Sequence, residues 1–229
     1  MDKFKKIVLN IPHSVSTMPL NNGWGDDIQA EIDKWTDWHT DTLFAPTTNN
    51  IDRVKPVIFP VSRFYCDAER LLNDPMENIG QGIVYKEFNG KKRNLTHSEE
   101  CKGMAYWYLH QTELSDKLCP HALIIDCHSF PTEVAPDVDI CIGYNQGWSR
   151  PDYDMIEYLC KAFEDMGYKV SLNSPYTNSI TPVDCNECYY KSVMIEVNKK
   201  IYLSDDNKLL PSAYKLNIAL NYLYSSLLE

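Results

Sequence analysis

Six short runs of apolar residues recur along the chain, and segments with a helical spacing of apolar positions separate them. Several of these runs are apolar at nearly every position, as expected for strands that are covered by helices on both faces. The pattern predicts strands at residues 7–11, 57–61, 122–126, 139–144, 169–172 and 193–197.

Four helices are predicted between these strands, at residues 26–45, 98–118, 151–166 and 212–228. The second opens with Ser98 as a candidate N-cap and with two glutamates in its first turn. The third begins at Pro151 and stops at Gly167. The alternation of strands and helices predicts an α/β fold, a three-layer α/β/α sandwich with a mixed, mostly parallel central sheet.

Length and charge narrow the classes of protein. The chain has 229 residues, with no repeat and no linker-like stretch, so a single domain over residues 1–229 is expected. Its net charge of −10 argues against nucleic acid and against anionic lipid as partners, since both call for clustered Lys and Arg. A charged N-terminus and the lack of any run of about 20 apolar residues predict a soluble, cytoplasmic protein.

Eight cysteines are scattered along the chain, mostly among apolar neighbours. In a reducing compartment we expect them to be free, buried thiols. Cys185 and Cys188 form the only C-x-x-C pair. A zinc finger would need a second Cys or Cys/His pair at a suitable spacing, so an ordinary loop is the simpler interpretation.

Candidate chemistry lies at the ends of the predicted strands, where ligands bind in this fold class. His13 follows the first strand, His128 follows the third, and Glu196 lies inside the last. A single histidine in such a place is usually structural, but two from different strands favour a shared site. A carboxylate buried among apolar neighbours costs several kcal/mol unless a metal, a proton or a Lys or Arg compensates its charge.

Arginine is scarce, with five in the chain, yet Arg63 and Arg70 lie within eight residues of one another. This placement favours a bidentate clamp for a carboxylate, which lysine does not match. Two imidazoles, a carboxylate base and two guanidiniums together predict a hydrolytic metal site for an anionic substrate. The third metal ligand is open at this stage among Asp37, His39 and Asp41.

The ordered series of motifs from His13 to Tyr202 resembles the N-formylglutamate amidohydrolase family, and through it the zinc carboxypeptidase and aspartoacylase superfamily. The motifs are Pro12-His13-Ser14, Thr36-Asp37-Trp38-His39, Ser62-Arg63, Asp67-Ala68-Glu69-Arg70, Asp126-Cys127-His128-Ser129, Pro136-Asp137-Val138-Asp139, Pro175-Tyr176 and Ile195-Glu196-Val197-Asn198.

The resemblance implies one metal ion, normally Zn²⁺, with His13 and His128 as two of its ligands and Asp37 as the preferred third. It implies that Glu196 is the base that activates water, with Arg63 near the scissile carbonyl. Arg70 is the implied partner of the substrate carboxylate, with Ser129 and Asn198 as further substrate contacts. The implied activity is hydrolysis of the N-formyl or N-acyl amide of an acidic amino acid, such as N-formylglutamate.

Three positions depart from the patterns of these families. Ser16 stands where the carboxypeptidase pattern has a metal-binding Glu. Glu69 stands where the family often has Asn, which weakens the case for a dicarboxylate unless the side chain points away or binds a cationic group. Asn178 replaces a frequent glycine, a mild change because Asn tolerates positive φ.

Because of these departures, the sequence is also compatible with two other functions. The first is a zinc exopeptidase or deacylase that acts on another small acyl amino acid or peptide, and Glu69 is the residue that favours it. The second is a non-catalytic member of the fold that binds an anion or a metal, for which Ser16 is the main support. A serine or cysteine hydrolase is disfavoured because the chain has no Gly-x-Ser-x-Gly elbow.

Overall fold

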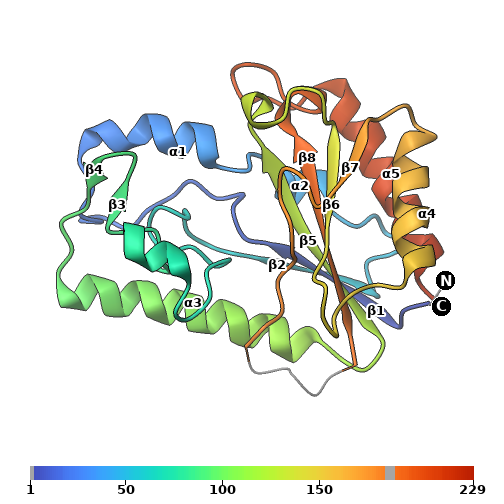
Figure 1. Cartoon of the computed structure of the whole chain (residues 1–229), viewed down its shortest axis with the longest axis horizontal. Coiled ribbons are helices and arrows are strands. Elements are labelled where there is room, and N and C mark those ends of the chain that lie inside the picture. Colours follow the sequence, from blue (N-terminus) through green and yellow to red (C-terminus); the bar gives the residue numbers. More distant parts are fainter. Residues whose placement is uncertain (1–2, 184–188) are drawn as a thin grey trace.

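The computed structural model describes residues 3–183 and 189–229, and a six-stranded sheet lies at its centre (Figure 1). The strand order is β2-β1-β5-β8-β6-β7. Neighbouring strands among the first four are parallel, whereas β6 runs antiparallel to β8 and β7 runs parallel to β6. The predicted mixed, mostly parallel sheet is thus confirmed. Its strands are β1 (Lys6–Ile11), β2 (Val54–Ile58), β5 (Ala122–Phe130), β6 (Ile140–Gly143), β7 (Val170–Leu172) and β8 (Lys191–Asn198).

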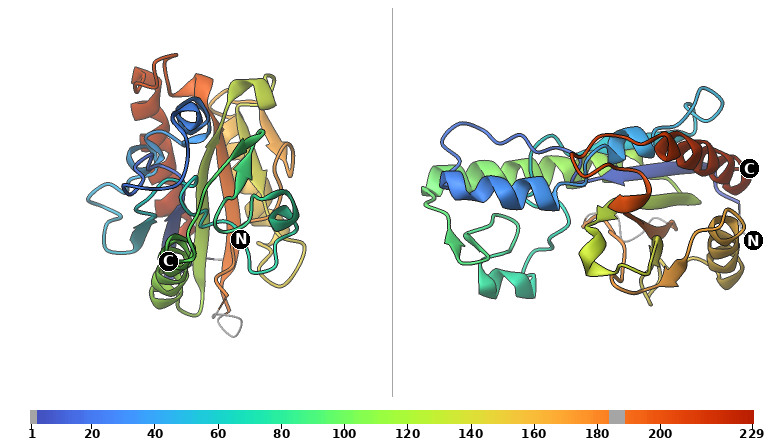
Figure 2. Two further views of the ribbon diagram at one scale, coloured as in Figure 1. Left: turned by 90° about the vertical axis from the view of Figure 1, so that its left-hand side faces the viewer. Right: turned by 90° about the horizontal axis from the view of Figure 1, so that it is seen from above.

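Helices cover both faces of this sheet, which gives the predicted three layers (Figures 1 and 2). On one face, α2 (Thr40–Leu43), α4 (Tyr153–Glu164) and α5 (Pro211–Leu227) pack on alternate strand residues such as Leu9 and Ile125. On the other face, α3 (His97–Lys117) packs through Leu114 on Val8 and Ile124. Successive side chains of a strand point to opposite faces of the sheet. Because helices cover both faces, nearly every side chain of the central strands is buried.

A second group of elements extends past one side of the sheet, at the left of Figure 1. It contains α1 (Gln29–Trp35), the hairpin of β3 (Glu87–Phe88) and β4 (Lys91–Lys92), and the first half of α3. Its packing depends on aromatic side chains, among them Phe64, which meets Tyr85 and Phe88 at ring distances of 5.9 and 5.0 Å. The sequence pattern did not predict this hairpin.

The predicted helix at 26–45 is wrong in its middle, because two separate helices, α1 and α2, occupy its ends. The backbone is extended at Thr36, with ψ of 133°, and left-handed at His39, with φ of 62°. Two further corrections are smaller. Strand β2 lies at Val54–Ile58 rather than 57–61. Helix α3 is capped by Thr96 rather than Ser98, in a reciprocal capping box with Glu99.

Six cysteines lie in the described residues, and all six are free thiols. Cys66, Cys127 and Cys141 are buried as expected, whereas Cys101 is exposed. Cys185 and Cys188 lie outside the described residues. Among the helices that the structure describes, none has the length and apolar character needed to cross a membrane.

Candidate functional site

His13 stands at the carboxyl edge of the sheet because the buried, parallel strand β1 ends two residues before it. The imidazole is buried, and its Nε2 atom lies 2.8 Å from Oδ1 of Asp67. Its other nitrogen, Nδ1, is buried and has no hydrogen-bond partner among the described residues. An unpaired buried nitrogen is costly, so this atom is oriented for a ligand.

His128 lies inside β5, because this strand continues to Phe130 rather than ending at Asp126 as expected. Residues two apart in a strand share a face, so Asp126 and His128 lie side by side. Nε2 of His128 is 3.0 Å from Oδ1 of Asp126. Cys127 points to the opposite face, where it belongs to the hydrophobic core.

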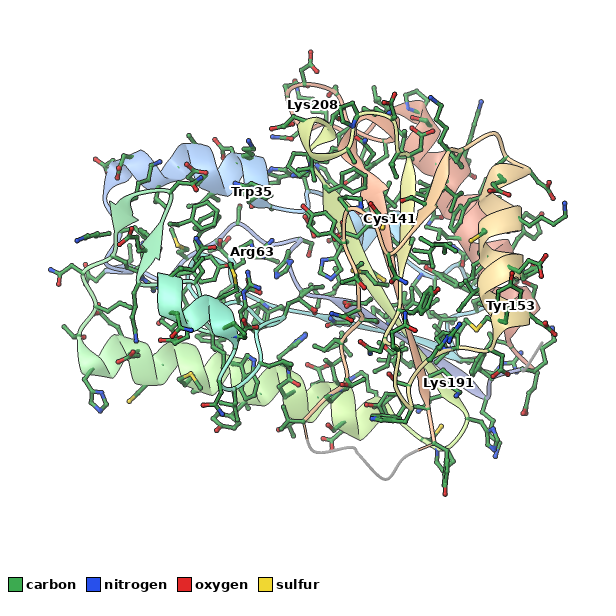
Figure 3. All side chains as sticks on the ribbon, in the orientation of Figure 1. Trp35, Arg63, Cys141, Tyr153, Lys191 and Lys208 are labelled. Atoms are coloured by element: carbon green, nitrogen blue, oxygen red, sulfur yellow. The ribbon has the colours of Figure 1, made fainter. Side chains whose placement is uncertain are left out.

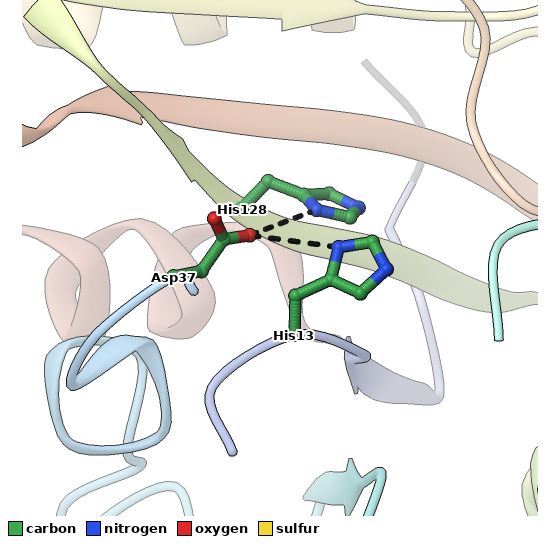
Figure 4. Close-up of side chains that lie close together, drawn as sticks. All are labelled: His13, Asp37 and His128. Carbon is green, nitrogen blue, oxygen red and sulfur yellow. Dashed lines mark hydrogen bonds and ion pairs between the residues drawn. The ribbon is translucent and has the colours of Figure 1, made fainter. Parts of the chain in front are cut away.

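Asp37 enters the site from the break between α1 and α2. Its Oδ2 atom lies 3.2 Å from Nδ1 of His128 and 3.7 Å from Nδ1 of His13 (Figure 4). The two alternative ligands do not join this group: His39 contacts the carbonyl of Asn207, and Asp41 is exposed. The structure therefore brings together His13, Asp37 and His128, as the sequence had favoured.

The donor set of these three residues fits a metal ion such as Zn²⁺. Each Nε2 atom faces a carboxylate, Asp67 or Asp126, so each Nδ1 is left to offer its lone pair toward the carboxylate of Asp37. This arrangement matches the carboxylate–histidine–metal pattern of zinc sites. Ligand atoms bound tetrahedrally at 2.0–2.1 Å lie about 3.3 Å apart, close to the separations from Asp37. With both imidazoles neutral, the three acceptors converge on one point, where a metal cation would compensate the charge of Asp37.

Glu196 lies beside this group on β8, where it pairs in register with His128 of β5. The side chain is buried, and its Oε2 atom has no hydrogen-bond partner among the described residues. No Lys or Arg of the described residues forms an ion pair with it. A purely structural ion pair therefore does not explain this buried carboxylate. Burial raises the pKa of Glu196 to about 8.

Arg63 and Arg70 converge on the fully buried carboxylate of Asp67. Nη2 of Arg63 is 3.0 Å from Oδ2 of Asp67, and Nε of Arg70 is 3.6 Å from the same oxygen. The hydroxyl of Tyr85 donates to it at 2.6 Å. Burial opposes ionisation of Asp67, but Arg63 and then His13 outweigh it and hold its pKa well below the usual range. Two guanidiniums thus share one internal carboxylate.

A cavity of about 820 Å³ opens onto these groups. It is in the size range of small-molecule sites. Trp35, the last residue of α1, and Arg63 line it, and both lie between the sheet and the β3–β4 hairpin in the view of Figure 3. Glu69 lines it too: its Oε1 accepts a hydrogen bond from Nδ2 of Asn10 at 2.5 Å, and its Oε2 lies 4.0 Å from Nε2 of His128. Burial, and then Asp126, raise the pKa of Glu69 well above its usual range.

The two expected substrate contacts differ in their access to the cavity. Ser129 borders the cavity, but the alternation along β5 directs its side chain to the face opposite His128. Asn198 is fully buried and is not among the residues that line the cavity. Its amide nitrogen donates to the carbonyls of Ala135 and Val138, and its oxygen accepts from Lys200 N and Thr132.

Sequence reasoning missed the residues that support the ligands. Asp67 and Asp126 belong to the motifs but were not predicted to support the ligands, although Asp126 stands two residues before His128 in a strand and so shares its face. Asn10 donates to Glu69 and Asp126 and accepts from His110 at 2.7 Å. His110 stands 100 residues away in sequence, and no local pattern links it to the site.

Comparison with known proteins gives concordant matches. The model of the N-formylglutamate amidohydrolase family matches residues 5–203. A crystal structure of N-formylglutamate amidohydrolase from Ralstonia eutropha superposes with a TM-score of 0.76 at 16% identity, covering 98% of this chain and 92% of that one. A gene product from Agrobacterium tumefaciens gives a TM-score of 0.64 at 15% identity, with 98% and 88% covered. No curated protein matches the chain.

Proposed function

Because the chain belongs to the N-formylglutamate amidohydrolase family, we propose that it is a metal-dependent enzyme that hydrolyses the N-formyl or N-acyl amide of an amino acid, with N-formylglutamate as the first candidate substrate. The observation that carries the proposal is the convergence of His13, Asp37 and His128 next to Glu196. Their donor atoms all lie within 4.8 Å of one another in the wall of the cavity.

His13, Asp37 and His128 would hold a Zn²⁺ ion, which when bound polarises an amide carbonyl and lowers the pKa of water. Glu196 takes a proton from the attacking water and passes it to the leaving nitrogen. Water thus adds across the C–N bond, giving formate and the free amino acid from an N-formyl substrate. Proton transfer by such a base is worth 10²–10⁴-fold in rate.

The two arginines divide the remaining work. Arg63 lies beside Asp67 and stabilises the negative charge that develops on the carbonyl oxygen. Arg70 binds the substrate carboxylate, because its side chain lines the cavity and holds Asp67 only at the longer distance of 3.6 Å. Since both share Asp67, the pair has about one positive charge in surplus, which suits one substrate carboxylate.

The test is hydrolysis of N-formyl-L-glutamate and other N-acyl amino acids by Zn²⁺-loaded protein. Glu196→Gln should lose 10²–10⁴-fold in kcat while it keeps its metal. Glu164→Gln, on the exposed face of α4, is the matched control and should behave as wild type. Equal rates in the Glu196→Gln variant and wild type would show that Glu196 is not the base. Stoichiometric ligand binding without any turnover would instead support the non-catalytic function.

Glu69 favours a second candidate, a deacylase for an amino acid with a cationic side chain. Of the charged side chains that line the cavity, Arg63, Arg70 and Glu69 are about equally open to it, at 20%, 22% and 19% exposed. A cation that enters the cavity would favour the ionised form of Glu69 despite its raised pKa, so two guanidiniums and this carboxylate are best matched by one carboxylate and one cation. A second carboxylate would meet Glu69 and, at the rim, Asp74.

Substrate preference separates the two candidates. If the cationic substrate is correct, wild type should prefer N-formyl-L-lysine to N-formyl-L-glutamate, and Glu69→Gln should shift the ratio of kcat/KM about tenfold toward glutamate. Glu164→Gln, on the exposed face of α4 and outside the cavity lining, removes the same charge and is the control. A wild-type preference for N-formyl-L-glutamate would exclude the cationic substrate.

A further inference from the structure

Asp37 is the one residue of the metal-ligand group that is delivered by a helix break rather than by a sheet strand or its end. The local backbone supplies part of its support: its amide donates to the carbonyl of His13 at 2.9 Å, and its carbonyl accepts from Thr40 N at 3.1 Å. The carbonyls on either side, at Thr36 and Trp38, need other donors, because the break leaves them outside any helix.

Both donors come from one segment that follows β8. Nζ of Lys199 donates to the carbonyl of Thr36 at 2.7 Å and to that of Lys34 at 2.5 Å. The hydroxyl of Tyr202 donates to the carbonyl of Trp38 at 2.8 Å. Asp37 is therefore bracketed, one residue before and one residue after, by hydrogen bonds from Lys199 and Tyr202.

The same segment continues directly from Glu196. Lys199 and Tyr202 come three and six residues after it, in and next to the 3-10 helix Lys199–Ile201. Asn198 fixes the start of this helix by accepting from Lys200 N and by donating to two carbonyls of the loop before β6. The buried amide that was expected to touch substrate thus anchors the segment that holds Asp37.

We propose that Lys199 is a positioning residue for the metal ligand Asp37, acting through the carbonyls of Thr36 and Lys34, with Tyr202 as the second support. The proposal rests on the metal site of the proposed function. Through Lys199, the end of β8 and the 3-10 helix after it set the positions of both Glu196 and Asp37. Burial lowers the pKa of Lys199, in keeping with an ammonium withdrawn from water against the end of α1.

Lys200 offers a matched comparison. It is the next residue, it also donates to a carbonyl, that of Pro136, and it pairs with Asp139 at 3.0 Å. None of these contacts reaches Asp37 or its neighbours. Removing either ammonium deletes one positive charge and its hydrogen bonding to backbone carbonyls, but only Lys199 makes such a bond next to Asp37.

The experiment measures Zn²⁺ affinity by chelator competition and the visible absorption of the Co²⁺-substituted full chain. Lys199→Met should weaken Zn²⁺ binding 10–100-fold, the usual cost of losing a residue that supports a ligand, and should change the Co²⁺ spectrum. Lys199→Arg should recover part of the affinity, and Lys200→Met should match wild type. Equal affinity and equal spectra for Lys199→Met and Lys200→Met would overturn the proposal.

Two further measurements keep the result unambiguous. If Lys199→Met does not fold, Tyr202→Phe removes only the hydroxyl on the other side of Asp37 and should still alter the Co²⁺ spectrum; an unchanged spectrum would count against the proposal. If wild type binds no metal, the proposed function fails. Amide exchange of residues 36–39 then decides on Lys199 alone: it should be faster in Lys199→Met than in Lys200→Met, and equal rates would overturn it.

Discussion

Acid should destabilise this protein through His110, a buried histidine that contacts the site through Asn10. The ring is 3% exposed, its Nε2 is 2.7 Å from Oδ1 of Asn10, and it meets the edge of Phe59 at 5.1 Å. Since Nδ2 of Asn10 donates to Glu69 and Asp126, its oxygen must face His110, which therefore donates from Nε2.

The size of the effect follows from the pKa. Burial lowers the pKa of His110 from 6.5 to about 4. Between these values the unfolded chain takes up a proton that the folded protein does not. The contribution of His110 to the free energy of unfolding is therefore complete above pH 6.5 and is lost as the pH falls toward 4. At pH 5 the loss in unfolding free energy is about 2 kcal/mol.

Urea unfolding of metal-free protein at pH 7 and pH 5 measures this loss. Other groups titrate in the same range, so the informative quantity is the difference between variants. His110→Gln keeps a donor for Asn10 and should lose about 2 kcal/mol less than wild type between the two pH values. His97→Gln, at an exposed position, is the control. An identical loss in wild type and His110→Gln would refute the reasoning.

Three other variants probe the site and its frame. Asp126→Asn should weaken Zn²⁺ binding 10–100-fold in chelator competition, because His128 loses its carboxylate partner; unchanged affinity would show that this partner is dispensable. Arg70→Lys should raise KM for an N-formyl amino acid by about tenfold with little change in kcat, since lysine cannot replace a guanidinium fork; an unchanged KM would place the carboxylate elsewhere. Gly143→Ala should cost 1–3 kcal/mol in urea unfolding, because a Cβ there would lie 2.8 Å from the carbonyl oxygen of Asn178; wild-type stability would mean that the loop gives way.

The central sheet was predictable because its strands are buried on both faces and so appear in the sequence as continuous apolar runs. Runs such as 122–126 and 193–197 are short, bounded and apolar at almost every position, a pattern typical of strands covered on both faces. Their ends were less predictable. Strand β5 continues through polar His128 to Phe130, since parallel pairing with β8 persists into the site. A polar residue marks the end of a buried strand only if its side chain faces solvent, and Asp126 and His128 of β5 face the site instead.

The break that places Asp37 could not be read from periodicity. Residues 26–45 carry apolar positions at helical spacing, and local sequence favours one helix. Distant groups decide the outcome: the carbonyl of His13 accepts from Asp37 N, and Lys199 and Tyr202 satisfy carbonyls in the break. These partners lie up to 164 residues away in sequence, so the choice among Asp37, His39 and Asp41 needed three-dimensional structure.

The two candidate histidine ligands were predictable because metal binding restricts them to a few residue types, and both lie at or near the end of a strand. The supporting network of Asp67, Asn10, Tyr85 and His110 was not, since its members are ordinary polar residues whose significance comes from pairing in the fold. Asn198 shows the converse. The resemblance implied substrate contact, yet its amide bonds within the protein, accepting from Lys200 N and Thr132 and donating to the carbonyls of Ala135 and Val138.

The metal content of purified protein tests the central claim most directly. Wild type dialysed against Zn²⁺ and then against buffer should retain one ion per chain, and His13→Ala and His128→Ala should each lose it, because both imidazoles face Asp37. Stoichiometric zinc retained in both variants would contradict the assignment of His13, Asp37 and His128 as the metal site.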